Sequence, residues 1–321
     1  MDGHRHSLSE RTWRIATYAV PLGFLALGFA YPLVSILERG LTSAPLDVLT
    51  DPLTRDVVWF TFWQALASTA LTFALGLPAA YVLGRYAFPG RSLVRALVVV
   101  PFVLPTVVVA LAFLAVLPAG LERGWVAILI AHAFFNIAVV VLIVGTFWAG
   151  LDRRVTEAAA TLGAGPWRSF REVTLPLLAP ALAAAGSIVF LFCFTSFGIV
   201  LILGGPAYST IEAEIYNQAV RIFDLRVAAI LSVIQLLCVG AAVWIALKLE
   251  TGVAAARGAR PEKDVLRRPG TRREWSVVVG SLAVLAAFLG VPLAVLVERS
   301  ISFGDGYSLA AYRALSHPTT A

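Results

Sequence analysis

The chain has little charge, little cysteine and no nucleotide-binding signature. Only 14% of its 321 residues are charged and 59% are hydrophobic, whereas soluble domains average about 25% charged residues. This balance excludes a single water-soluble core. Two cysteines exclude a disulfide scaffold, and no histidine or cysteine spacing matches a zinc site. No Gly-x-x-x-x-Gly-Lys-Ser/Thr phosphate loop occurs. We therefore expect an integral membrane protein that hydrolyses no ATP itself and has no metal site or cofactor.

Long uncharged runs are present instead. Seven stretches contain no Asp, Glu, Lys or Arg, and each is long enough to cross a bilayer, because about 20 helical residues span a hydrocarbon core of about 30 Å. Backbone groups in lipid must bond to one another, which selects helices. Prolines inside the runs, such as Pro78, Pro101 and Pro105, are expected to kink these helices. The predicted spans are Ile15–Leu37, Val57–Gly84, Ala96–Leu117, Trp125–Gly150, Leu178–Leu203, Val227–Leu247 and Trp275–Val297.

Basic residues are distributed unevenly between alternate connecting segments. One set of segments, which includes the N-terminal tail, carries 18 of the 25 Lys and Arg residues, and the other set carries 7. Basic residues accumulate on the cytoplasmic side of membrane helices. The sequence therefore predicts a multi-pass protein of the cytoplasmic (inner) membrane with a cytoplasmic N-terminus. The net charge of +6 then reports topology and contact with membrane lipid, and no aromatic-interleaved basic patch favours nucleic acid.

The sequence of the seventh span is similar to that of the first. Pro32-Leu33 followed by Glu38-Arg39 is matched, at an offset of 260 residues, by Pro292-Leu293 followed by Glu298-Arg299. If the repeat is genuine, its second copy stops soon after one span, and we expect the chain to be truncated at Ala321. The alternative is a natural seven-span protein with a polar tail, in which two apolar helices match by chance.

The cytoplasmic segment Leu151–Leu177 contains a pattern of helix and turn signals. Alanines dominate Val155–Leu162 and favour a short helix that Asp152 can cap. Gly163 and the following Gly165-Pro166 end it sharply, and a second helical turn can form before Pro176. The sequence therefore predicts a compact helix–turn–helix on the cytoplasmic face.

This segment resembles the EAA loop of permease subunits of binding-protein-dependent type I ABC importers. The family pattern is Glu-Ala-Ala, three residues, Gly, nine residues, an aliphatic residue, any residue, Leu-Pro. Every position of the pattern is met here, by Glu157, Ala158, Ala159, Gly163, Val173, Leu175 and Pro176. The resemblance implies a coupling helix that docks into a groove of a cytoplasmic ATPase subunit. The first four of these residues would carry the contact.

The wider resemblance covers roughly residues 57–250. Pro101–Ala110, Phe192–Gly198 and Leu203–Pro206 are similar to segments of the ferric iron and thiamine permeases, which usually fuse two permease halves in one chain. The resemblance implies an all-α integral membrane protein, a polytopic helical bundle with the MetI-like type I ABC permease fold. The expected domains are 1–56 (tail, first helix and external loop), 57–250 (permease core with EAA loop 151–177), 251–274 (cytoplasmic linker) and 275–321 (start of a second, incomplete repeat).

Polar residues inside the spans have two interpretations. His132 and Asn136 lie four residues apart on one helix face, where they either line a translocation path or form interhelical hydrogen bonds. Thr195 and Ser196, among phenylalanines, line a passage or belong to ordinary packing. Cys193 is expected to be a small apolar filler.

The expected function is that of a permease moving a small solute, ferric iron slightly ahead of thiamine, by alternating access. The resemblance implies three partners: a cytoplasmic ABC ATPase dimer, an extracytoplasmic substrate-binding protein, and a second permease half from a homodimer or a separate chain. The main alternative is an ion-coupled secondary transporter, and a non-transporting membrane scaffold is the third class. Ion coupling usually needs intramembrane charge, and the seven runs have none.

Overall fold

The structure is a computed structural model that describes residues 17–42, 45–255, 266–303, 306–309 and 312. The expected N-terminal tail, the middle of the expected linker and the last nine residues, including Ala321, lie outside these ranges. The described residues are almost entirely helical, with one pair of two-residue strands, β1 (Ser302–Phe303) and β2 (Gly306–Tyr307). The all-α prediction is therefore confirmed for this part of the chain.

The chain divides into two compact units, Met1–Val57 with Ile211–Cys238, and Val58–Thr210 with Val239–Ala321. Two long helices, α4 (Pro52–Arg85) and α13 (Leu225–Ala255), continue from one unit into the other. The first unit also contains a candidate span at Thr17–Ile36, together with η1 (Ala26–Ala30), α2 (Tyr31–Thr42), α3 (Pro45–Thr50), α12 (Ile211–Tyr216) and η3 (Asn217–Ile222), where η marks a π-helical stretch.

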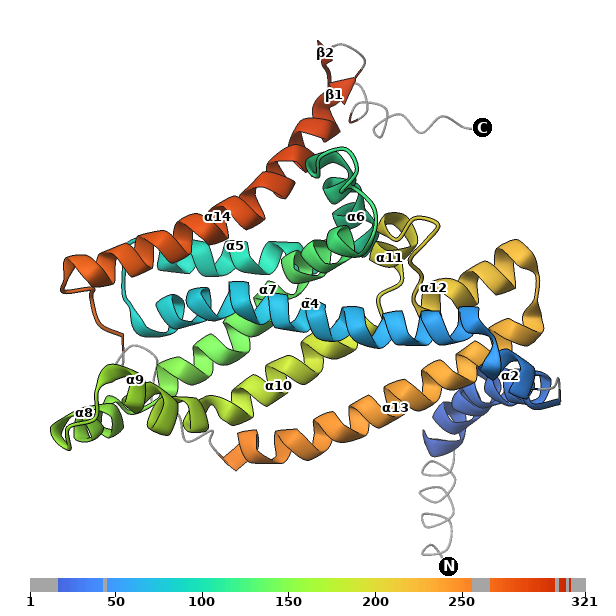
Figure 1. Cartoon of the computed structure of the whole chain (residues 1–321), viewed down its shortest axis with the longest axis horizontal. Helices are drawn as coiled ribbons and strands as arrows, with labels where there is room; N and C mark the ends of the chain where they lie inside the picture. Colours follow the sequence, from blue (N-terminus) through green and yellow to red (C-terminus); the bar gives the residue numbers. More distant parts are fainter. Residues whose placement is uncertain (1–16, 43–44, 256–265, 304–305, 310–311, 313–321) are drawn as a thin grey trace, which may run out of the picture. The chain divides into compact units, whose positions relative to one another are not determined.

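The second unit contains most of the membrane helices. Its helices α7 and α10 pack side by side, with α8 and α9 beyond one end of the pair and α6 and α11 near the other (Figure 1). The elements are α5 (Arg91–Val103), α6 (Thr106–Val116), α7 (Trp125–Gly150), α8 (Arg153–Thr161), α9 (Pro166–Ser169), η2 (Phe170–Thr174), α10 (Leu175–Phe194), α11 (Gly198–Leu203) and α14 (Arg272–Ile301).

Two of the seven predicted spans are broken rather than kinked. In the described residues six helices are long and apolar enough to cross a membrane, and a seventh crossing results if α5 and α6 count as one span bent by 101°. Pro105 lacks the N–H that would continue α5, and it holds Leu104 in an extended conformation with ψ 142°. The second break separates α10 from α11 at residues 195–197. Pro78 and Pro101, in contrast, lie inside continuous helices.

Helix α7 is the centre of the second unit. The structure buries 72% of its apolar window, against 22% for α14. Helix α4 approaches it closely, because a Cβ built on Gly84 would lie 2.6 Å from the carbonyl oxygen of Gly145 and one on Gly145 would lie 3.2 Å from that of Ala80. Small residues allow such backbone-to-backbone packing between membrane helices.

A clasp joins the start of α14 to the end of α4. The Ala87 amide donates to the Arg267 carbonyl (2.9 Å), and the Arg267 amide donates to the Arg85 carbonyl (3.2 Å). The Arg267 guanidinium pairs with Glu274 and lies 5.0 Å from the Tyr86 ring centroid. Burial, with the Tyr81 hydroxyl, raises the pKa of Tyr86 to about 12, so this phenol stays neutral at physiological pH.

We predict that Gly84→Ala destabilises the protein. The added methyl group meets a backbone oxygen that cannot rotate away, so α4 and α7 must separate at an expected cost of about 1–3 kcal/mol. The measurement is the thermal unfolding midpoint in a fixed detergent. The matched control is Gly280→Ala in α14, where an added Cβ has nothing within 4 Å and helix propensity favours alanine. Equal midpoints for the two variants would contradict the close approach.

Candidate functional site

The predicted cytoplasmic helix is present as α8, and its two ends are capped differently. At its start the Asp152 carboxylate accepts a hydrogen bond from the Arg154 amide (3.0 Å). At its end the Gly163 amide donates to the Ala160 carbonyl and the Ala164 amide donates to the Ala159 carbonyl, both at 3.0 Å. Gly163 has φ +83°. These two bonds and the left-handed residue form a Schellman cap, which strongly favours glycine at this position.

A chain of four aromatic rings connects the loop to the membrane helices. Trp167 stacks on Phe170 with centroids 5.8 Å apart, and Phe170 stacks on Trp148 of α7 at 6.5 Å. Trp148 in turn packs edge-on against Tyr81 of α4 at 5.1 Å. Helical structure then continues without a break from Pro166 through Pro176 to Phe194. The loop is therefore part of the same packed body as α4, α7 and α10.

The exposed surface of the loop carries two large apolar side chains. Leu162 is 88% exposed and Trp167 is 72% exposed, although both belong to residue types that normally lie in a core or an interface. Glu157 and Ala158 of the family motif are also exposed, whereas Ala159 and Val173 are half-buried. The family pattern does not specify Leu162 or Trp167, so neither residue could be singled out before its exposure was known. Leu175 and Pro176 are exposed at the start of α10.

The polar residues of α7 lie inside the bundle. His132 and Asn136 are each 1% exposed. His132 Nδ1 lies 3.1 Å from the hydroxyl of Ser68 on α4, and the Asn136 amide donates to the thiol sulfur of Cys193 on α10 (3.4 Å). The Gln64 amide donates to the Cys193 carbonyl (2.9 Å).

Cys193 is therefore part of a polar network and is not the plain apolar filler that the sequence suggested. Its neighbours come from α4 and α7, far away in the sequence, so only the tertiary structure brings them together. The interhelical interpretation of His132 and Asn136 agrees with this network, since neither side chain reaches the surface of the described bundle.

Thr195 and Ser196 lie at the break between α10 and α11. The Thr195 hydroxyl donates to the Leu191 carbonyl (2.8 Å), and the Ser196 carbonyl accepts from the Thr210 hydroxyl (3.4 Å). The break is flanked by Phe192 and Phe197, which are 41% and 39% exposed. It also adjoins the other broken span, because α11 packs on α6.

The break between α10 and α11 and the break between α5 and α6 come into close contact at one position. A Cβ on Gly198, the first residue of α11, would lie 2.6 Å from the Thr106 hydroxyl at the start of α6. Irregular backbone at membrane depth is tolerated where protein surrounds it. Thr195 and Ser196 therefore stand where non-helical backbone, hydroxyl groups and exposed aromatic rings occur together. Among the described residues no three His, Cys, Asp or Glu side chains are placed to hold a metal ion.

The acidic residues of segment 204–224, which the sequence predicts to be external, have hydrogen-bond partners nearby. Glu212 accepts from the Gln235 amide (3.3 Å), and burial raises the pKa of its carboxyl group. Glu214 is buried and accepts from Gln218 (2.7 Å). Asp224 caps α13 by accepting from two backbone amides. These carboxylates thus have local structural partners.

The chain matches the family model of the inner membrane component of binding-protein-dependent transport systems over residues 73–249. It therefore belongs to that family, and it is a multi-pass permease component of the bacterial inner membrane rather than an enzyme.

The thiamine transport system permease protein ThiP of Escherichia coli (strain K12) is 30% identical over 285 residues, which cover 80% of this chain and 52% of that protein. The sulfate transport system permease protein CysT of Salmonella typhimurium (strain LT2) is 36% identical over 204 residues, which cover 59% of this chain and 74% of that protein. The chain thus spans about half the length of the thiamine permease it matches.

A solved structure shares the fold. It belongs to a bacterial ABC transporter involved in the import of the acidic polysaccharide alginate. The TM-score is 0.58 at 16% sequence identity, and the match covers 78% of this chain and 99% of that chain.

We predict that Gly163→Ala weakens the helix–turn–helix by about 1 kcal/mol. An added Cβ meets nothing within 4 Å, so the cost comes from the left-handed backbone alone. The measurement is hydrogen–deuterium exchange over residues 153–170, which should become faster. Gly165→Ala is the matched control, because Gly165 also has open space but a φ of −65°. Similar exchange in both variants would count against the Schellman cap.

Proposed function

We propose that the chain is the permease subunit of an ATP-driven importer that moves a small solute into the cytoplasm by alternating access. The observation that supports this most is the EAA loop. It is capped by Gly163, fastened to two membrane helices by stacked rings, and presents Leu162 and Trp167 on its exposed surface. A docked element of this kind can transmit rigid-body motion from a partner to the helices.

The proposed partners follow from family membership and topology. An ATPase dimer docks on the cytoplasmic loop through Glu157, Ala158, Ala159 and Gly163, with the N-terminus on the same side of the membrane. A substrate-binding protein docks on the external face, and a second permease half completes the pathway. That half comes from a second copy of the chain or from a separate chain. In the proposed division at residues 57–250, 251–274 and 275–321, α14 begins a second permease repeat within this chain.

The proposed substrate is thiamine, with ferric iron and sulfate as alternatives. The sequence placed ferric iron slightly ahead of thiamine as the expected substrate. We now place thiamine first, because the relatives described above are named for thiamine and sulfate. Exposed Phe192 and Phe197 beside Thr195 and Ser196 suit an aromatic cation, which such rings attract through their faces. An anion such as sulfate would need donors or basic groups instead.

An ion-coupled secondary transporter is the competing class. The uncharged spans and the internal pairing of His132 with Ser68 favour ATP coupling over a proton relay. The test is uptake of labelled thiamine, iron and sulfate by vesicles that contain the permease, its second half, the ATPase and the binding protein. ATP should drive uptake without an ion gradient. Uptake driven by a proton gradient in vesicles depleted of ATP would overturn the proposal.

We predict that the double variant Leu162→Ser, Trp167→Ser loses most of its ATPase association. Two large apolar side chains that become buried in an interface each contribute about 1–3 kcal/mol, so affinity should fall at least tenfold. The measurement is co-purification of the ATPase, together with ATP-dependent uptake. Leu121→Ser is the control, because Leu121 is 48% exposed on the external side and should leave association unchanged. Unchanged association in the double variant would remove these residues from the interface.

A further inference from the structure

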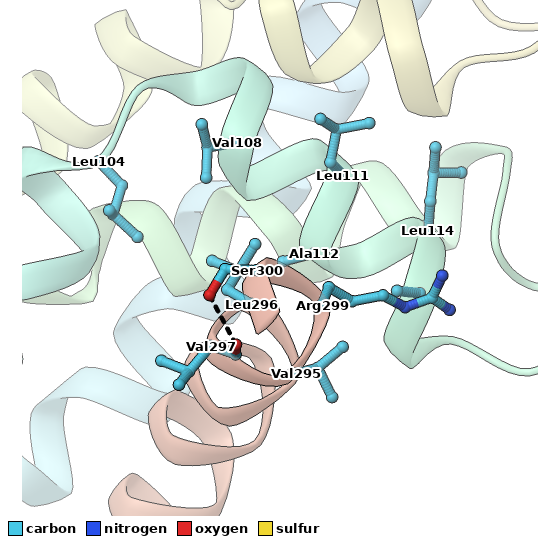
Figure 2. Close-up of a pocket in the computed structure, with 11 residues that line it drawn as sticks. Leu104, Val108, Leu111, Ala112, Leu114, Val295, Leu296, Val297, Arg299 and Ser300 are labelled. Carbon is cyan, nitrogen blue, oxygen red and sulfur yellow. Dashed lines mark hydrogen bonds between the residues drawn. The ribbon is translucent and has the colours of Figure 1, made fainter. Parts of the chain in front are cut away.

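A groove of about 670 Å³ lies between α6 and α14, within the second unit. Its walls are almost entirely aliphatic, and Arg299 stands at one edge with its guanidinium extended toward Leu114 (Figure 2). The Ser300 hydroxyl donates a hydrogen bond to the Val297 carbonyl (2.7 Å). The other lining residues are Leu104, Val108, Leu111, Ala112, Ala115, Val295 and Leu296.

The groove adjoins the bend in the third span. Helix α6 packs on α14 and departs from the direction of α5 by 101°. Apolar residues on both sides remain open, including Leu111 (51% exposed) and Val297 (64% exposed). Beside the break at Pro105 there is thus an apolar groove that no described residue fills.

The length of α14 places the mouth of the groove at the outer face of the bilayer. This step depends on the proposed orientation, in which α14 starts on the cytoplasmic side. A bilayer is about 40–45 Å thick with its headgroups. From Arg272 to Arg299 α14 advances about 40 Å, which brings Arg299 to the external headgroup layer.

The positive charge of Arg299 at the mouth of the groove indicates which kind of molecule binds there. No described residue forms an ion pair or hydrogen bond with the Arg299 guanidinium, and the side chain is exposed. Glu298 is adjacent in sequence but does not line the groove, because successive helical residues point about 100° apart. A transmembrane helix seated here would need an anion at this depth to match Arg299, whereas a phospholipid carries its phosphate there.

We propose that the groove binds one anionic phospholipid of the outer leaflet. One acyl chain lies in the groove between α6 and α14, and the phosphate accepts charge-assisted hydrogen bonds from Arg299. The lipid takes the place of the missing side-chain contacts and holds α14 against the core at its external end, as the Arg267–Glu274 clasp does at its cytoplasmic end.

The experiment is native mass spectrometry of the full chain released from nanodiscs made of equal parts phosphatidylglycerol and phosphatidylcholine. One phosphatidylglycerol should remain bound to the wild type. Arg299→Gln should reduce its retention about tenfold, because a charge-assisted hydrogen bond contributes enough for one order of magnitude in affinity. Arg226→Gln, which removes another exposed external arginine, should retain the lipid. Equal retention in the two variants, or no selectivity for phosphatidylglycerol, would overturn the proposal.

A photo-crosslinking residue at Leu111 identifies the occupant directly. Phosphatidylglycerol adducts that disappear with Arg299→Gln support the lipid site. The matched position is Val284, which is 57% exposed on α14 outside the groove, and its lipid adducts should not respond to Arg299→Gln. Adducts to a protein partner at Leu111 would assign the groove to a helix of a second permease half and overturn the proposal. Neither measurement uses transport, so a failure here is distinguishable from failure of the importer function.

Discussion

The close packing of α4 against α7 is the constraint on which the second unit depends. The backbones touch at Gly84 and Gly145, and α7 is buried over most of its length. Lipid offers no hydrophobic drive for helices to associate, so close contact and interhelical hydrogen bonds must supply the attraction. The pairs Ser68–His132, Gln64–Cys193 and Asn136–Cys193 tie α4, α7 and α10 together at the depth where water cannot compete.

The segment from α8 to η2 extends this packing beyond the end of α7. Tyr81 and Trp148 are the last aromatic residues of α4 and α7, and they continue directly into the stacked pair Phe170–Trp167. Since α9, η2 and α10 form one uninterrupted helical stretch, a displacement of the loop must move α10 and the break at Thr195 with it. At the opposite end of α10 the broken spans bring irregular backbone and hydroxyl groups together. The break at Pro105 also adjoins the groove beside α14.

Much of this could be predicted from the sequence, for identifiable reasons. Uncharged runs of more than 20 residues leave helices as the structure that satisfies the backbone in lipid, and the predicted Trp125–Gly150 coincides with α7. Asp152 and Gly163 are local signals that act within a few residues, so the capped helix and its turn were also predictable. The same reasoning treated Pro101 and Pro105 alike, and only one of them breaks a helix. Which proline breaks a helix depends on the tertiary surroundings, and the segment after Pro105 packs on α11 and α14.

The sequence by itself determined the membrane class, the number of apolar runs, the charge asymmetry and the family motif, because these depend on composition and on residues close together in the chain. Only the tertiary structure decided that Cys193 joins a polar network, that Leu162 and Trp167 remain uncovered, and that α14 leaves an aliphatic groove beside Arg299. Each of these properties depends on partners that lie tens to hundreds of residues away. Side chains from different helices determine burial, and no local pattern records it.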